Sequence, residues 1–446
     1  VGASINKNGT IKFKAEKVGS DTAISQIIKL VEDAQGSKAP IAKLADIIAG
    51  YFVPVVVCIA IVSGLAWFIS GKDVVFSLTV FIAVLVIACP CALGLATPTA
   101  IMVGTGKGAE NGILIKGGEA LEITHKINTI VFDKTGTITE GKPVVTDIIN
   151  FNNITEDELL KIAASAEKSS EHPLGEAIVR NCEEKNLGFY KVDKFMALPG
   201  HGIEVIIDNK DVLLGNIKLM RDKNIHIENL DLESDKLAGE GKTPMYIAID
   251  GKVAGIIAVA DIVKENSARA IKKLHDMGIE VAMITGDNEK TAKAIASQVG
   301  IDRVLAEVLP QDKSSEVKKL QEENKFVAMV GDGINDAPAL AQADIGIAIG
   351  SGTDVAMESA DIVLMRSDLL DVPTAIRLSK ATMTNIKENL FWAFGYNVIG
   401  IPVAAGVLYL FDGPLLNPVI AALAMAFSST SVLLNALRLK RFKVEK

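Results

Sequence analysis

Thr129–Thr137, with the sequence Thr-Ile-Val-Phe-Asp-Lys-Thr-Gly-Thr, is the stretch that decides the fold. Its first four residues are uncharged and mostly apolar, which predicts a buried strand of a parallel sheet. The strand ends at Asp133, and Gly136 permits a tight turn just after it. A carboxylate there can attack a phosphoryl group and form an acyl phosphate, which splits one transfer into two steps. An isolated Asp at a strand end could instead cap a helix, but the sequence Asp-Lys-Thr-Gly-Thr favours the nucleophile.

Three later runs resemble this first strand. They are Val281–Ile284, Val327–Val330 and Ile345–Ile349, and helical patterns such as Val263–Met277 and Thr291–Val299 lie among them. Strands that alternate with helices indicate an open α/β sheet, whose chemistry is expected at the carboxyl ends of the strands.

A glycine-rich acidic turn follows the run Val327–Val330. It contains Asp332, Asn335 and Asp336, and carboxylate and amide oxygens are hard ligands that suit Mg²⁺. An ion there would bridge Asp133 and a phosphate and offset their mutual repulsion. A Ca²⁺ loop is the competing interpretation, but the turn lacks a closing Glu at the required spacing.

Two further features fit a phosphate site. Thr285, Gly286 and Asp287 follow the run Val281–Ile284, and a hydroxyl and an amide at a strand end suit a phosphate. Lys313 can neutralise a transferring phosphoryl group. Each feature is weak alone, because Gly-Asp turns are frequent and a lone Lys is more often a solvated surface charge.

The composition combines many apolar residues with many charged ones, so we expect the two kinds to lie in different parts of the chain. Hydrophobic residues make up 49% and charged residues 22% of its 446 residues. The formal net charge of −8 argues against a nucleic-acid partner, which would need a basic face. Four cysteines in so long a chain do not make a disulfide framework, which favours a reducing compartment for the soluble parts.

Four uncharged stretches are long enough to cross a bilayer, since a span needs about 20 apolar residues. They are Ile47–Gly71, Val74–Gly106, Asn389–Phe411 and Gly413–Leu437, and they pair as two hairpins. Long buried core helices are the alternative, but their length and lack of charge argue against it. Lys and Arg flank the side of the long middle segment, so the positive-inside rule makes that side cytoplasmic. We expect an integral membrane protein in a lipid bilayer, in the plasma membrane.

Together these motifs resemble those of the P-type ATPases, ion pumps with a haloacid-dehalogenase-like α/β phosphorylation domain. The resemblance covers nearly the whole chain. It implies that Asp133 is phosphorylated within a catalytic loop that includes Lys134 and Thr135, and that Asp133, Asp332 and Asp336 hold Mg²⁺. The resemblance also implies that Thr285, Gly286 and Lys313 bind the phosphoryl group and that Asp287 is a catalytic residue.

The region between Pro143 and Gly251 has its own helices and hairpin-like strands, for example Gly202–Ile207 and Met245–Ile249, and reads as an inserted α+β domain. Its Ser170-Glu171-His172-Pro173 and Gly200-His201-Gly202 resemble the nucleotide-binding motifs of the heavy-metal pumps. That resemblance implies ATP contacts at Glu167, His172, Gly200, Gly202, Gly215 and Asn216. Without it, His172 would be read as a surface histidine beside a helix.

Cys89-Pro90-Cys91 lies in the middle of the second uncharged stretch. Pro90 has no N–H, so the carbonyl of Val86 should lose its partner and the helix should unwind. Two thiolates beside that break suit a soft ion such as Cu(I), Zn²⁺ or Cd²⁺; two buried thiols that fill core space are the alternative.

Other intramembrane residues narrow the choice of the transported ion. The chain resembles the copper-transporting members, which implies that Cys89, Cys91, Tyr396, Asn397, Met425 and Ser429 contact the transported Cu(I). A zinc-type member is expected to carry an intramembrane Asp and Lys, and the four stretches contain neither.

These observations predict a domain order and a missing part. We expect an actuator-domain tail at 1–36, a transmembrane hairpin at 37–107, a phosphorylation domain at 108–142 and 253–378, a nucleotide-binding domain at 143–252, and a second hairpin with a basic tail at 379–446. The Thr-Gly-Glu loop of the family does not occur. We therefore expect the carboxyl-terminal part of a longer pump, which binds nucleotide without completing transport.

The function expected is ATP-driven export of Cu(I), with Mg²⁺ and ATP as cofactors and a copper chaperone as an additional partner. A Zn²⁺ or Cd²⁺ pump with the same chemistry is the nearest alternative. A membrane-anchored phosphatase and a non-catalytic metal-sensing remnant are alternatives from other classes.

Overall fold

A computed structural model describes residues 39–151, 154–170, 172–198, 200–226, 231–332, 336–350 and 358–443. The expected actuator tail at 1–36 lies outside the described residues, as do Glu171 and Asn335 of the two motifs. The described chain forms two compact units, one of residues 39–121 with 382–442 and one of residues 122–381.

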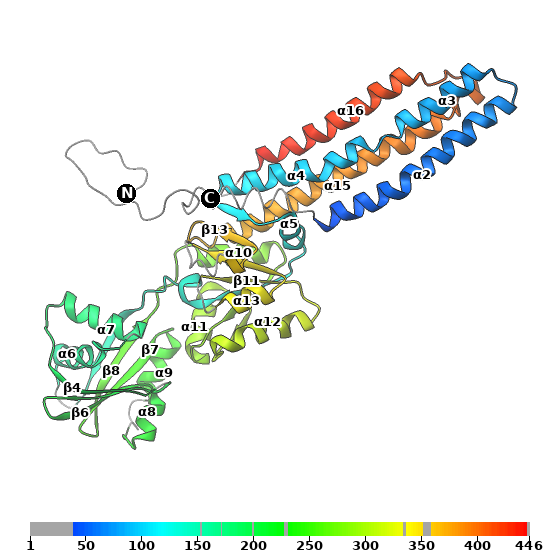
Figure 1. Ribbon diagram of the computed structural model, residues 1–446. Coiled ribbons are helices and arrows are strands. Elements are labelled where there is room, and N and C mark those ends of the chain that lie inside the picture. Colours follow the sequence, from blue (N-terminus) through cyan, green and yellow to red (C-terminus); the bar gives the residue numbers. More distant parts are fainter. Residues whose placement is uncertain are drawn as a thin grey trace, which may run out of the picture. The chain divides into compact units, whose positions relative to one another are not determined.

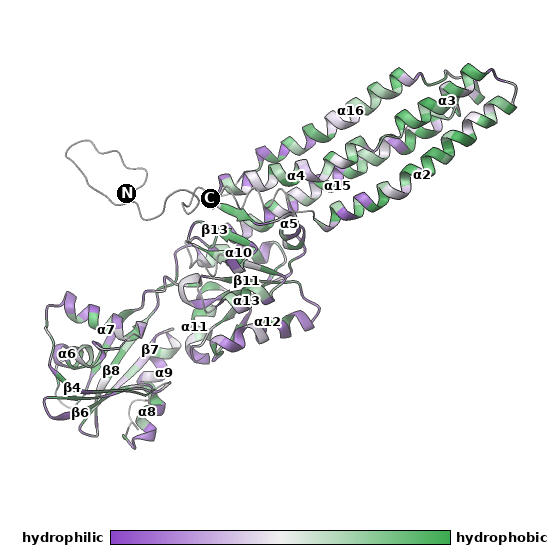
Figure 2. Cartoon of the chain, viewed as in Figure 1, coloured by the Kyte–Doolittle hydropathy of each residue, from purple (hydrophilic) through white to green (hydrophobic). Residues whose placement is uncertain are grey.

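The first unit is built almost wholly of helices (Figure 1). They are α2 (Pro40–Ile69), α3 (Val74–Ile87), α4 (Cys91–Glu110), most of α15 (Asp371–Ala404) and α16 (Pro418–Leu437), with the short strand β1 (Ile113–Ile115), the short helix α5 (Gly118–Thr124) and the turns η5 (Leu408–Phe411) and η6 (Arg438–Arg441). Figure 2 shows apolar residues along most of α2 and α3. A core of small and branched side chains from α2, α3, α15 and α16, including Ala60, Val84, Ile401 and Met425, holds these helices together.

Three helical stretches among the described residues are long and apolar enough to cross a membrane: Pro40–Ile69, Val74–Glu110 and Pro418–Arg441. The expected third span, Asn389–Phe411, is not one of these three. Its residues up to Ala404 form the second half of the 34-residue helix α15.

The second unit contains a parallel sheet with the strand order β13-β12-β11-β2-β9-β10. The strands are β2 (Thr129–Asp133), β9 (Glu280–Ile284), β10 (Arg303–Leu305), β11 (Val327–Gly331), β12 (Ile345–Ile349) and β13 (Ile362–Leu364). Between them run α10 (Ser267–Asp276), α11 (Glu289–Val299), η3 (Pro310–Asp312), α12 (Lys313–Glu322) and α13 (Ala337–Gln342). The four strands predicted from the sequence are confirmed, and four of the six strands have every residue buried.

A six-stranded antiparallel sheet is inserted after β2, with the order β3-β8-β7-β6-β5-β4. Its strands are β3 (Val144–Asn150), β4 (Val192–Leu198), β5 (Gly202–Ile207), β6 (Lys210–Gly215), β7 (Thr243–Ile249) and β8 (Lys252–Ala260), and its helices are α6 (Glu156–Glu167), α7 (Pro173–Glu184), α8 (Ile217–Asp222) and α9 (Asp231–Gly239). The sheet reaches Ala260, beyond the expected boundary at residue 252, because β8 pairs with both β3 and β7.

Alternate residues of the inserted sheet face two separate cores. Ile247 and Ile257 pack with Leu159 of α6 and Ile178 of α7. Their neighbours in the chain, Tyr246 and Ile256, instead pack with side chains of α8 and α9. This alternation is the period of two that strands require, so both faces of the sheet are covered.

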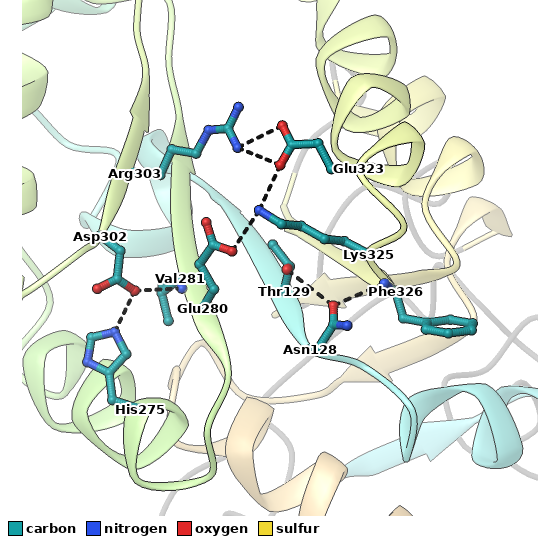
Figure 3. Close-up of polar contacts among 10 residues, drawn as sticks. All are labelled: Asn128, Thr129, His275, Glu280, Val281, Asp302, Arg303, Glu323, Lys325 and Phe326. Atoms are coloured by element: carbon teal, nitrogen blue, oxygen red, sulfur yellow. Dashed lines mark hydrogen bonds and ion pairs between the residues drawn. The ribbon is translucent and has the colours of Figure 1, made fainter.

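A network of polar contacts connects the amino ends of β2, β9 and β11 (Figure 3). These ends lie at the opposite edge of the sheet from Asp133. Lys325 forms ion pairs with Glu280 at 2.8 Å and Glu323 at 2.9 Å. The Asn128 side-chain oxygen accepts from the Phe326 N–H at 3.0 Å. The Lys325–Glu280 and Phe326–Asn128 contacts join segments far apart in the sequence at the amino ends of these strands.

Candidate functional site

Asp133 lies at the carboxyl end of β2, in the middle of the parallel sheet. Parallel pairing places it opposite Ile284 of β9 and places its neighbour Phe132 opposite Val330 of β11. The turns that follow these strands begin at Thr285 and Asp332, so three segments predicted from the sequence meet at one edge of the sheet. This is the edge at which open α/β folds carry their ligands.

Lys313, the first residue of α12, joins two of the carboxylates. Its Nζ donates to Asp133 Oδ1 at 2.6 Å and to Asp336 Oδ1 at 2.7 Å. All three side chains are buried. Lys313 is therefore not the solvated surface lysine that a lone Lys would predict; it is part of the site.

The electrostatics of this cluster depend on its low exposure to water. Burial, reinforced by the nearby charge of Asp336, raises the pKa of Asp133 to about 7, although Lys313 opposes the shift. Burial would lower the pKa of Lys313, but Asp133 and Asp336 more than offset it and the pKa is raised. Burial and Asp336 likewise raise the pKa of Asp332. The cluster has an excess of negative charge that a cation would stabilise.

The three carboxylates lie close enough together to be ligands of one divalent ion. One oxygen each of Asp133, Asp332 and Asp336 lies within 4.8 Å of the other two. Hard oxygen ligands around a small space suit Mg²⁺, which binds oxygens at ~2.0–2.1 Å and keeps several waters. The residues present therefore fit Mg²⁺ by the number and the chemistry of their oxygen ligands.

The loop after Asp133 is shaped by Gly136 and by a second ion pair. Gly136 has φ +75°, and a Cβ built there would lie 1.8 Å from Asp332 Oδ2, so the Asp332 carboxylate rests against this glycine. Lys134 is buried and pairs with Asp287 Oδ2 at 2.6 Å. Thr135 is exposed in this loop.

Thr285 and its neighbours form a compact turn. Thr285 is buried, and its Oγ1 accepts from the Asp287 N–H at 3.1 Å. Gly286 between them is exposed. Through Asp287, which pairs with Lys134, this turn lies beside the loop that follows Asp133.

The predicted nucleotide residues all line one cavity of about 340 Å³ in the inserted domain. They are Glu167, His172, Gly200, Gly202, Gly215 and Asn216. Leu174, Ala197, Leu198, Ile203, Pro244 and Met245 supply an apolar lining. A concave, mostly apolar cavity with a few polar groups is the ordinary form of a small-molecule site.

Two polar residues of this cavity differ in burial and in their hydrogen bonds. Glu167 is buried, burial raises its pKa, and its Oε2 has no hydrogen-bond partner in the described structure. His172 is exposed and caps α7, because its Nδ1 accepts from the Leu174 N–H at 3.3 Å. That contact leaves the hydrogen on Nε2, where it can donate.

Gly202 and Gly215 face each other across β5 and β6. A Cβ at Gly202 would lie 2.2 Å from the Leu214 oxygen, and one at Gly215 would lie 2.2 Å from the His201 oxygen. The two strands therefore approach each other too closely at this pair for either residue to carry a side chain.

The helix breaks at Cys89-Pro90-Cys91, as predicted. α3 ends at Ile87 and α4 begins at Cys91. The Val86 carbonyl does find a donor, however, because it accepts from the Cys89 N–H at 3.3 Å; this corrects the expectation that it loses its partner. The two cysteines are joined as a disulfide, which the sequence analysis did not predict, and a disulfide has no thiolate with which to bind a metal.

The remaining predicted ion contacts differ in burial. Cys89 packs in the same core as Met425, which is buried, while Tyr396 is exposed. Asn397 is buried, and its Oδ1 has no hydrogen-bond partner in the described structure. Ser428, which the prediction passed over for Ser429, is fully buried with an unpartnered Oγ, whereas Ser429 is half-buried.

Known proteins share this architecture. Residues 127–344 match the model of the haloacid dehalogenase-like hydrolases. The crystal structure of a zinc-transporting PIB-type ATPase in its E2.Pi state matches 95% of this chain and 68% of its own at 37% identity, with a TM-score of 0.75. The chain belongs to the P-type ATPases.

Curated P-type ATPases match it more strongly in sequence. A copper-exporting P-type ATPase of Staphylococcus saprophyticus subsp. saprophyticus is 56% identical over all 446 residues. One of Staphylococcus aureus is 57% identical over 448 aligned positions. The chain spans about half the length of these curated P-type ATPases, 55% of the first and 54% of the second.

Some residues of the P-type ATPase site could not be predicted from the sequence. Thr139 Oγ1 donates to Asp261 Oδ2 at 2.5 Å and also to the Lys134 carbonyl at 2.9 Å. Asp261 lies 122 residues further along the chain, directly after β8. The only signal in the sequence was that Asp261 ends an apolar strand, as Asp133 does.

Proposed function

We propose that this chain is part of an ATP-driven Cu(I) exporter that works through an acyl phosphate on Asp133. The observation that carries the proposal is the cluster at the carboxyl end of β2. There, Asp133, Asp332 and Asp336 lie with oxygens within 4.8 Å of one another, and Lys313 joins two of them. A buried carboxylate beside two further carboxylates and a lysine is suited to attack a phosphoryl group.

Each residue of the cluster has a distinct part in the proposed step. A carboxylate oxygen of Asp133 attacks the terminal phosphorus of ATP, and ADP leaves with the electrons of the broken P–O bond. Asp133, Asp332 and Asp336 would hold Mg²⁺, which supplies charge neutralisation for the phosphoryl oxygens. The Lys313 ammonium stabilises charge on the transferring group, and Thr285 and Gly286 hold its oxygens.

ATP is proposed to bind in the 340 Å³ cavity of the inserted domain. The His172 Nε2–H and the Glu167 carboxyl group supply polar contacts, and the apolar lining covers the base. Gly200 and Asn216 line this cavity together, and the Gly200 oxygen accepts from the Asn216 side-chain amide at 2.8 Å.

Cu(I) is proposed as the transported ion. Cys89 and Cys91, once reduced, and Met425 in the same core offer soft sulfur donors, which favour a monovalent soft ion. Asn397 and Ser428 each bury an unpartnered oxygen in this unit, and such atoms are expected beside a polar ligand. The names of the curated relatives, copper-exporting P-type ATPases, also support copper and the outward direction.

The chain is an integral membrane protein by its candidate spans and its family. We propose the plasma membrane as its location, with the catalytic unit on the cytoplasmic side, and a copper chaperone as the partner that delivers the ion. The basic turn Arg438–Arg441 after α16 supports that orientation.

Metal-stimulated phosphorylation of the reduced protein separates the proposed function from its alternatives. We expect Cu(I) to stimulate transfer of phosphate from ATP to the protein, Zn²⁺ to have little effect, and Cys89→Ser to abolish the response. Stimulation by Zn²⁺ alone would favour the zinc-transporting alternative, which the solved relative exemplifies. Phosphate transfer without any metal response would favour a phosphatase.

A further inference from the structure

Lys264 reaches the catalytic loop from the segment that returns from the inserted domain. It follows β8, and its Nζ donates to the Gly136 carbonyl at 2.5 Å and to Ser367 Oγ at 2.9 Å. The two acceptors lie 128 and 103 residues away along the chain. Lys264 is half-buried and was not singled out by any sequence motif.

Gly136 is the point on which the Asp332 carboxylate rests. Its φ of +75° turns the loop, and the absence of a Cβ leaves the space that Asp332 Oδ2 occupies. Gly141 packs on the same residue, because a Cβ at Gly141 would lie 3.0 Å from the Gly136 Cα. A shift or rotation of the Gly136 peptide would therefore move the surface that positions Asp332.

Backbone contacts hold Lys264 in place beside this loop. Thr139 and Val263 form an antiparallel bridge. The Lys264 N–H donates to the Ile138 carbonyl at 3.0 Å, and Ser267 Oγ donates to the same carbonyl at 2.8 Å. The backbone under Lys264 is thus fixed to the catalytic loop, so its side chain can restrain Gly136 with little freedom of its own.

We infer that Lys264, supported by Ser367, is a positioning residue for the Mg²⁺ site: it fixes the Gly136 peptide against which the ligand Asp332 is held. This inference rests on the Mg²⁺ site of the proposed function. Lys264 acts through Gly136 and Asp332 and contacts neither the ion nor the nucleotide. Residues that orient metal ligands typically contribute ~10-fold to 100-fold to metal affinity.

A purely electrostatic role for Lys264 makes the opposite prediction. Lys264 is close enough to Asp332 for their charges to attract each other. A cation near a cation site repels the ion, so removing its charge would tighten Mg²⁺ binding if position did not matter. Weaker binding after removal of the side-chain amine is therefore the mark of positioning.

The test is calorimetric titration of the nucleotide-free full chain with Mg²⁺ alone. We expect Lys264→Met to weaken Mg²⁺ binding by about 10-fold or more and Lys264→Arg, which can still donate to both acceptors, to restore most of it. Ser367→Ala should weaken binding by a smaller factor in the same direction. Lys272→Met, on the exposed face of α10, should bind Mg²⁺ as the wild type does.

Binding of an ATP analogue to the inserted domain is the second measurement. It should be unchanged in Lys264→Met, which excludes general misfolding as the cause of weak Mg²⁺ binding. Wild-type or tighter Mg²⁺ affinity in Lys264→Met would overturn the inference alone. No Mg²⁺ binding by the wild type, or binding unaffected by Asp332→Asn, would overturn the inference and count against the proposed Mg²⁺ site as well.

Discussion

Lys313 provides the positive charge inside the carboxylate cluster at the end of β2. In the sequence it is an ordinary lysine at the start of a helix. In the fold it is buried and donates to Asp133 and Asp336, where it compensates charge that would otherwise be isolated from water. Sequence predicted its role only through its neighbours in the motifs, because burial comes from the sheet edge around it.

Replacing Lys313 should therefore impair phosphate transfer more than ATP binding. We expect Lys313→Met to lower the rate of phosphorylation by ~100-fold or more, as removal of one preorganised charge stabiliser does. The affinity for an ATP analogue in the inserted domain should stay near that of the wild type. A parallel loss of nucleotide affinity would mean that Lys313 has a different role.

The buried carboxyl group of Glu167 leads to a prediction about how the stability of the protein depends on pH. Burial raises its pKa above the ordinary 4.5, so between 4.5 and the folded-state value the folded protein holds more protons than the unfolded one. Its contribution to stability is then present at low pH and is lost as pH rises through the folded-state pKa. Glu167→Gln, which carries no such charge, should gain melting temperature relative to the wild type as pH rises above 4.5.

Thermal unfolding of both proteins across that range checks this expectation. The same variant should bind an ATP analogue more weakly, since the carboxyl group lines the cavity. A constant difference in melting temperature at all pH values would show that Glu167 keeps the same protonation state throughout.

Several site residues were predictable because motifs mark them. Asp133, Thr285 and Asp332 each end or follow a buried strand, and parallel strands bring such residues together. Lys264, Thr139 and Asp261 were not predictable in this way. The Thr139–Asp261 and Lys264–Gly136 contacts cross 122 and 128 residues, and no local pattern of polarity in one sequence records such a contact.

At the scale of elements, the pairing of β5 with β6 depends on two facing glycines. Gly202→Ala should destabilise the inserted domain by roughly 1–3 kcal/mol, because Gly202 has φ +144° and its Cβ would meet the Leu214 carbonyl. Gly239→Ala is the matched control, since nothing lies within 4 Å of a Cβ there and its φ is not positive. Chemical denaturation of the two variants measures the difference, and equal stability would contradict the close pairing.

The cysteines at the break between α3 and α4 lead to a prediction about how Cu(I) binding depends on their redox state. With Cys89 and Cys91 paired as a disulfide, the unreduced chain should not bind Cu(I), because soft ions need the thiolates. Reduction should create the site, and Cys89→Ser should remove it again. Competition for Cu(I) with a coloured chelator, with and without reductant, measures this; equal binding in both states would place the copper elsewhere.

Element types were easier to predict than element ends. The four predicted strands of the parallel sheet are confirmed because continuous apolar runs flanked by turn residues leave few other choices. The end of α15 at Ala404 and the extension of β8 to Ala260 were not predicted. An uncharged run does not show where a helix stops, and the boundary of an inserted sheet is set by its partner strands.

At the scale of the whole molecule, the two units have separate chemistries. One is a set of apolar helices with sulfur donors and buried unpartnered oxygens. The other holds a carboxylate cluster and a nucleotide-sized cavity. The helix α15 begins in the second unit and continues into the first, so one continuous helix belongs to both units.

The central claim is that Asp133 accepts phosphate from ATP. Its most direct test is acid precipitation of the reduced protein after brief exposure to Mg²⁺, Cu(I) and ATP radiolabelled in the terminal phosphate. We predict an acid-stable label in the wild type that is absent in Asp133→Asn, whose amide is isosteric but is not a nucleophile. A label that persists in Asp133→Asn, or a wild type that takes up none, would contradict the account.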